Sequence, residues 1–109
     1  MTKLELIEKL STLPELIAEQ EIDVINANLQ VLASKGILTE AEDVLILSGA
    51  IDGKNAETRN AQLRAKTAKE REAIQDAEND LSVARVELNR LNNELSVCRA
   101  IAGMLKGVE

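Results

Sequence analysis

Six basic residues between positions 54 and 71 are the strongest candidates for a chemical role in this sequence. Only two acidic residues lie among them, so this segment has a net charge of +4, whereas the whole chain of 109 residues has −6. Clustered lysine and arginine can hold phosphate groups through salt-sensitive contacts that do not depend on base sequence. The predicted phosphate or partner contacts are Lys54, Arg59, Arg64, Lys66 and Lys69.

A second interpretation of the basic segment needs no ligand. On a helical hairpin its charges would form a solvated face that pairs with Glu40, Glu42 and Asp43. The chain contains no aromatic residue that could stack on bases. Nucleic-acid binding therefore stays an alternative and is not the favoured interpretation.

The other reactive residue types form no catalytic or metal-binding pattern. The chain has no histidine, which removes the commonest acid-base group and metal ligand. Cys98 has no clear base beside it and is expected to act as a small buried hydrophobic residue, or else to meet its copy in a dimer seam. Asp76 and Asp80 lie one helical turn apart, a spacing that on an exposed helix usually means hydration alone. We expect no enzyme activity, no metal and no cofactor.

The elements that would position these residues are helices. Apolar residues recur at alternating intervals of three and four between positions 74 and 105, which is the heptad repeat of a coiled coil. The members of this row are Ile74, Ala77, Leu81, Ala84, Leu88, Leu91, Leu95, Cys98, Ala102 and Leu105.

The first half of the chain predicts a broken helical arm over residues 2–50. A capping box at Thr2 begins a short N-terminal helix, and Pro14 predicts a break or kink at residues 11–13. A second helix then runs to about Lys35, where Gly36 is a good stop signal, so the arm is either broken at Gly36 or one continuous helix.

This second helix carries two parallel rows of apolar residues. We assign Ile22, Ile25, Leu29 and Leu32, which continue from Ala18, to the core of the hairpin. The neighbouring row needs a further helix to cover it and is assigned to contacts between copies. Its members are Ile17, Val24 and Val31.

A turn over residues 51–55 joins the arms. Asp52 and Gly53 supply turn chemistry, and Asn55 is a plausible cap for a second arm over residues 56–105. The box-like residues Thr67 to Glu70 predict an irregularity in that arm. With the arms antiparallel and Gly53 at the midpoint, Ile22 would face Ala84.

Together these features predict an all-α fold, a long antiparallel helical hairpin in a single domain, residues 1–109. Because a lone hairpin buries little core for each residue, we expect a dimer or tetramer that forms a helical bundle. A parallel homodimer through residues 74–105 is the competing arrangement, in which Asp80 meets Arg85 and Glu94 meets Arg99. The predicted hairpin core consists of Ile22, Ile25, Leu29, Leu32, Ile74, Leu81, Leu88, Leu91 and Leu95.

Three stretches resemble small helical-hairpin proteins of phages and prophages. They are Leu13 to Glu21, Ile51 to Leu63 and Glu87 to Leu105, of which GKNAETR is the most distinctive piece. The resemblance implies a protein of the bacterial cytoplasm with an accessory role in phage recombination or replication. The interrupted first arm departs from the family pattern.

Two function classes follow. The preferred one is a non-enzymatic assembly or adaptor protein whose hairpins associate with one another and with a protein partner. The alternative is an accessory DNA-binding protein that contacts phosphates through the basic segment. No stretch approaches the roughly 18 apolar residues of a membrane span, so we expect no membrane insertion.

Overall fold

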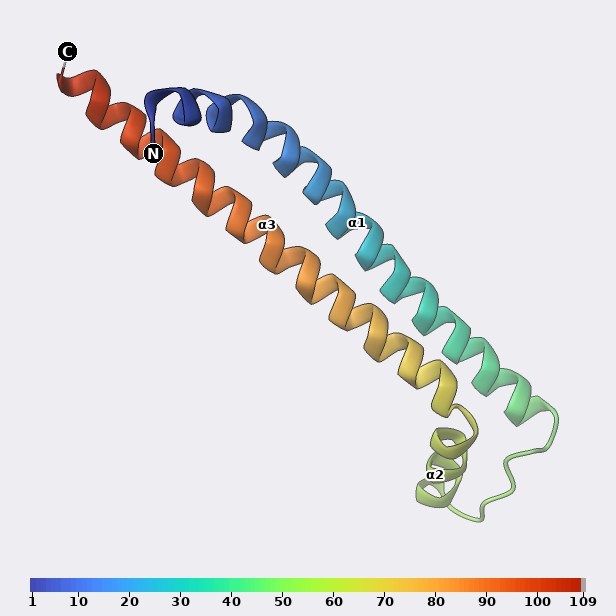
Figure 1. Ribbon diagram of the computed structural model, residues 1–109. Coiled ribbons are helices and arrows are strands. Elements are labelled where there is room, and N and C mark those ends of the chain that lie inside the picture. Colours follow the sequence, from blue (N-terminus) through green and yellow to red (C-terminus); the bar gives the residue numbers. More distant parts are fainter. Residues whose placement is uncertain (109) are drawn as a thin grey trace. The chain divides into compact units, whose positions relative to one another are not determined.

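The computed structural model describes residues 1–108 and is an all-α helical hairpin (Figure 1). Helix α1 spans Lys3–Leu47, α2 spans Ala56–Lys66 and α3 spans Ala68–Val108. No strand occurs among the described residues. Helices α1 and α3 pack against each other and run in opposite directions, as predicted.

Helix α1 is continuous, so the predicted separate N-terminal helix is wrong, and of the two alternatives at Gly36 the structure has the unbroken arm. Thr2 caps the helix, because its Oγ1 accepts a hydrogen bond from the Glu5 amide at 3.1 Å. Pro14 lies inside the helix and cannot donate to the carbonyl four residues before it. Figure 1 shows α1 bending in this N-terminal part, as expected of a proline inside a helix, so a kink is present where a break or kink was predicted.

The side of α1 that faces α3 carries an unbroken heptad repeat. From Leu6 to Leu45 its positions alternate by four and three residues, and every member is buried or half-buried. We call this set the inner row. It consists of Leu6, Leu10, Leu13, Ile17, Gln20, Val24, Ala27, Val31, Ser34, Leu38, Ala41 and Leu45.

The two apolar rows of α1 have exchanged roles relative to the prediction. Ile17 and Val31, assigned to contacts between copies, are buried, and Val24 is half-buried. The residues assigned to the hairpin core are instead 56 to 58% exposed, and we call them the outer row: Ile22, Ile25, Leu29 and Leu32. Because the two rows lie on opposite faces of one helix, only one of them can face α3.

The predicted row on α3 does face α1. Leu81, Leu91 and Leu95 are buried, and Ile74 and Leu88 are half-buried. Since α1 already covers this row, a parallel dimer through the same residues would have to displace α1. The predicted register is also shifted, because Gln20 and not Ile22 meets Ala84, whose carbonyl accepts a hydrogen bond from Gln20 Nε2 at 3.1 Å.

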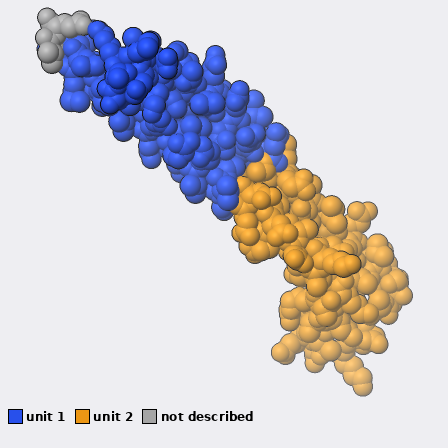
Figure 2. Space-filling view, in the orientation of Figure 1, with its two compact units in different colours: residues 1–26, 82–109 blue, residues 27–81 orange. Residues whose placement is uncertain are grey.

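The chain divides into two compact units, and each contains a part of both arms (Figure 2). Unit 1 consists of Met1–Asn26 and the described part of Ser82–Glu109. Its core is a cluster of apolar side chains from α1 and α3 in which the thiol of Cys98 is fully buried. The buried members are Leu6, Leu13, Ile17, Leu91, Leu95 and Cys98.

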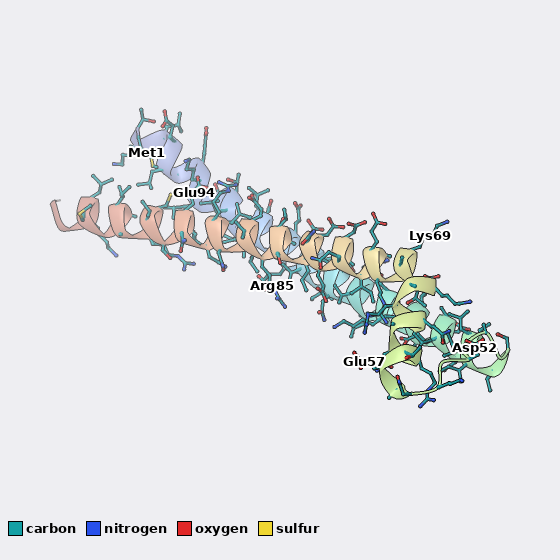
Figure 3. The ribbon with its side chains drawn as sticks, turned by 90° about the horizontal axis from the view of Figure 1, so that it is seen from below. Met1, Asp52, Glu57, Lys69, Arg85 and Glu94 are labelled. Atoms are coloured by element: carbon teal, nitrogen blue, oxygen red, sulfur yellow. The ribbon has the colours of Figure 1, made fainter. Side chains whose placement is uncertain are left out.

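An ion pair joins the two arms beside the core of unit 1. Lys9 Nζ donates a hydrogen bond to Glu94 Oε1 at 2.8 Å, and Arg90 approaches the other carboxylate oxygen of Glu94 at 3.4 Å. Figure 3 shows Glu94 on the stretch of α3 that lies along the start of α1. The hydrogen bond from Lys9 lowers the pKa of Glu94 and raises that of Lys9.

These pKa shifts predict how the ion pair contributes to stability at different pH values. The stabilisation from Glu94 is present above its ordinary pKa of 4.5 and is lost as the pH falls through its lowered value. The stabilisation from Lys9 is present below 10.5 and is lost as the pH rises through its raised value. In urea titrations, Lys9→Met should therefore cost most near neutral pH and least at both extremes. A cost that grew on acidification would contradict the ion pair, and Lys106→Met is the matched control.

Unit 2 consists of Ala27–Leu81 and contains the reversal of the chain. Its buried residues are Val31, Ser34, Thr67, Ala77 and Leu81. Serine, threonine and alanine bury less apolar area than the leucines and isoleucine of the unit 1 core.

Candidate functional site

The turn region, residues 48–71 of unit 2, holds the basic segment. Helix α1 ends at Leu47, and Gly49 adopts the left-handed conformation with φ of 77°. Such a glycine is the usual end of a helix, since a side chain would be strained there. The connection therefore spans residues 48–55 and is longer than the predicted turn over 51–55.

The end of the connection is fastened to α2 as the predicted cap requires. Asn55 Oδ1 accepts a hydrogen bond from the Thr58 amide at 2.8 Å, which confirms Asn55 as the N-cap. Gly53 packs so closely on α2 that a Cβ atom would lie 2.9 Å from the Arg59 nitrogen. Glycine is therefore needed at position 53 for space, in contrast to Gly49, where φ demands it.

Gln62 ties the connection to α2. Its Oε1 accepts a hydrogen bond from the Gly53 amide at 2.9 Å, and its Nε2 donates to Asp52 Oδ1 at 2.7 Å. Arg59 Nη1 also donates to the Gly53 carbonyl at 3.2 Å. Asp52 and Arg59 thus have structural roles, and the role of Gln62 is one that the sequence pattern did not indicate.

A break at Thr67 separates α2 from α3, where the sequence predicted an irregularity. Thr67 is fully buried and has φ −117° and ψ 26°, outside the helical region. Its hydroxyl donates to the Leu63 carbonyl at 2.6 Å and accepts from Arg71 Nε at 3.0 Å. The predicted capping box with Glu70 is thus replaced by a hydrogen bond with Arg71.

The same arginine links the break to α1. Arg71 Nη2 lies 3.9 Å from Glu42 Oε2, which is one of the ion pairs that the sequence suggested. Arg71 therefore connects α1, α3 and the end of α2, and its charge is used inside the fold. This arrangement is consistent with part of the basic segment being structural.

The remaining predicted contact residues are exposed. Lys54 lies in the connection, and Arg64 and Lys66 lie on the last turn of α2. Lys69 lies at the start of α3 (Figure 3). Among the described residues, none of these four basic side chains forms an ion pair. Helix α2 contains no fully buried residue, and of its side chains Gln62 and Leu63 are half-buried while the others are exposed.

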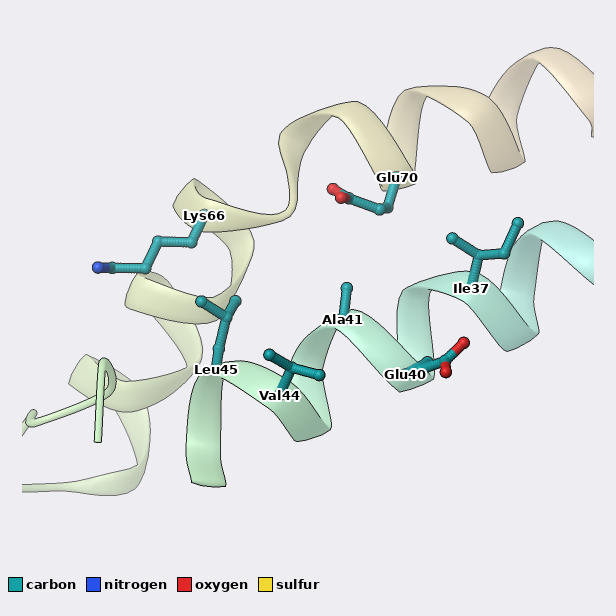
Figure 4. Close-up of a pocket in the computed structure, with 7 residues that line it drawn as sticks. All are labelled: Ile37, Glu40, Ala41, Val44, Leu45, Lys66 and Glu70. Carbon is teal, nitrogen blue, oxygen red and sulfur yellow. The ribbon is translucent and has the colours of Figure 1, made fainter. Parts of the chain in front are cut away.

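An open groove of about 440 Å³ lies between α1 and the α2–α3 junction (Figure 4). Its apolar wall comes from α1 through Ile37, Ala41, Val44 and Leu45, and charged side chains stand around it. The ammonium group of Lys66 points away from this wall in Figure 4. A shallow apolar surface with charges at its margin suits contact with a protein segment better than small-molecule chemistry.

The described residues hold neither a metal-binding cluster nor a membrane-spanning helix. Within the described part of the chain, no group of three or more acidic, cysteine or histidine side chains could hold a metal ion. Over the same residues, no helix has the length and apolarity that crossing a bilayer requires.

Comparisons with protein-family models, with curated proteins and with solved structures found no match.

Proposed function

We propose that the protein is a non-enzymatic assembly protein, whose hairpins associate with one another and present their surfaces to a protein partner. The observation that carries this proposal is the outer row of α1. Four large aliphatic side chains at intervals of three, four and three residues are each more than half exposed. Exposed apolar stripes of this kind usually mark interaction surfaces.

The resemblance to phage and prophage hairpin proteins suggests where such an assembly protein would act. It suggests the cytoplasm of a bacterial host and an accessory position beside recombination or replication. The adaptor function itself depends on the outer row and not on the resemblance.

DNA binding is the second candidate, favoured by the four exposed cations Lys54, Arg64, Lys66 and Lys69. Carboxylates in the same turn region, Asp52 and Glu57 among them, oppose it by repelling phosphate (Figure 3). A helix without aromatic residues also offers no stacking platform.

Light scattering coupled to size exclusion separates the two candidates. The protein alone should elute as a discrete dimer or larger assembly, and short single-stranded or duplex DNA should leave its mass unchanged at low and moderate salt. A monomer at every concentration would overturn the assembly proposal. A mass increase with DNA that disappears as salt is added would favour the second candidate.

A further inference from the structure

The geometry points to a second copy of this chain as the occupant of the outer row, with the two α1 helices antiparallel and a twofold axis that crosses the outer row midway between Ile25 and Leu29. This inference rests on the proposed function and specifies the site, orientation and register of the association. It follows from the outer row, from the small residues at its ends and from two flanking charges.

The outer row is a self-contained heptad repeat on one continuous helix. Ala18 and Gly36 continue its spacing at the two ends, and beyond them the repeat meets Glu15 and Thr39. The contact between the two α1 helices, which we call the seam, is therefore limited to six positions, the outer row and its two end residues Ala18 and Gly36. It lies on the face of α1 opposite the inner row, so a second helix can cover it without disturbing α3.

Within this seam, only one antiparallel register pairs every large residue with another large residue. In this register the twofold axis crosses the outer row midway between Ile25 and Leu29. Ile22 then lies opposite Leu32 and Ile25 opposite Leu29, and each pair occurs twice by symmetry. At both ends Ala18 meets Gly36, and this small pair allows the backbones to approach. The resulting core has four layers of isoleucine on leucine.

Shifting the register by one heptad in either direction loses these pairs. One shift places Leu32 against Glu15, and the other places Ile22 against Thr39. Both shifts bring a polar residue into the seam, which costs free energy when the polar group is buried without a partner.

The charges beside the seam select the same register. Glu21 and Lys35 lie on the same flank of the outer row and are exposed. In the proposed arrangement Glu21 of each copy meets Lys35 of the other, which gives two complementary pairs. The second shifted register would instead bring Glu21 to Glu42. On the opposite flank Asn26 meets its own copy and Glu19 meets Ala33, so no like charges are opposed.

Lys35 is free to move to a second copy at little cost. Within its own chain its Nζ lies 3.9 Å from Glu78 Oε1, and about half of each side chain is exposed. Ion pairs so exposed contribute little to stability. A parallel arrangement would not use the same partners, because there Glu21 would flank Asn26 and Lys35 would flank Glu40.

A charge-reversal cycle tests orientation and register together. Sedimentation equilibrium at low salt gives the dimer dissociation constants of the parent, Glu21→Lys, Lys35→Glu and the double variant. Each single reversal should raise the constant about tenfold, because it replaces two weak attractions by two repulsions in a symmetric dimer. The double variant should recover to within about threefold of the parent, because exposed ion pairs of either polarity are worth about the same.

Two control variants separate this contact from other effects. Glu78→Gln removes the carboxylate that pairs with Lys35 within the chain, and Glu19→Lys reverses a charge that faces Ala33 of the other copy. Both should leave the dissociation constant within about threefold of the parent, as surface changes away from a contact do. Circular dichroism verifies that all variants are equally helical.

The outcomes distinguish this inference from the proposed function. Loss in both single variants with recovery in the double supports the antiparallel register. A parent dimer whose double variant does not recover overturns the register but leaves assembly standing. A parent that is monomeric throughout overturns both.

Discussion

Val31→Asp is expected to unfold much of the protein, whereas Leu32→Asp, one residue away, is expected to leave the fold intact. Val31 is 5% exposed on the inner row and Leu32 is 57% exposed on the outer row. A carboxylate in the inner seam would be taken out of water among apolar side chains, at a cost of about 3 kcal/mol or more. At position 32 the same group stays in water, and the cost should be below about 1 kcal/mol.

Urea titration followed by circular dichroism measures this difference at low protein concentration, where assembly contributes least. Both variants place the same residue in the middle of the same helix, so their helix-propensity costs differ only by the difference between valine and leucine, which is on the order of a few tenths of 1 kcal/mol. Equal costs at the two positions would show that the inner and outer rows are assigned wrongly.

Leu91→Ala should have the second largest effect. Leu91 is 5% exposed within the unit 1 core, where it belongs to the same buried cluster as Leu13 and Ile17. Truncating it removes buried methyl and methylene groups and leaves a cavity, so the free energy of unfolding should fall by about 3 kcal/mol. Thermal and urea unfolding would both show the loss.

Val97→Ala is the matched control for this truncation. Val97 is on the same helix, is 55% exposed and lies outside the cluster. Its replacement should change stability by less than about 0.5 kcal/mol, and the better helix propensity of alanine could make the change favourable. If Leu91→Ala cost no more than this control, the unit 1 core would not be the main source of stability.

The heptad row on α3 could be predicted because it is the one long apolar repeat in that half of the chain. On α1 there are two repeats, and both look suitable in the window from residue 17 to residue 32. The distinction lies in their length. The inner row continues from Leu6 to Leu45, whereas the outer row ends near Glu15 and Thr39.

Because breaks were expected at Pro14 and Gly36, the inner row was not recognised as one repeat that runs through both positions. Local propensity disfavours both residues inside a helix, but packing of the inner row along α3 outweighs the cost. Both residues are exposed, so neither takes a core position. Tertiary contacts of this kind cannot be seen in a local window.

The candidate site shows the same division between local and tertiary signals. Asn55 as a cap and an irregularity near Thr67 follow from local chemistry and are present. The hydrogen bonds of Gln62 and the contact between Arg71 and Glu42 depend on how the chain returns on itself. The basic segment was visible as a charge pattern, but which of its members the fold uses could be found only from the structure.

The central claim is that α1 has two apolar faces, one that closes the hairpin and one that joins two copies. Sedimentation equilibrium with circular dichroism on the parent, Val31→Asp and Leu32→Asp tests it most directly. The account predicts a helical dimer for the parent, a helical monomer for Leu32→Asp and a loss of helix for Val31→Asp. A Leu32→Asp variant that dimerises as tightly as the parent would contradict it.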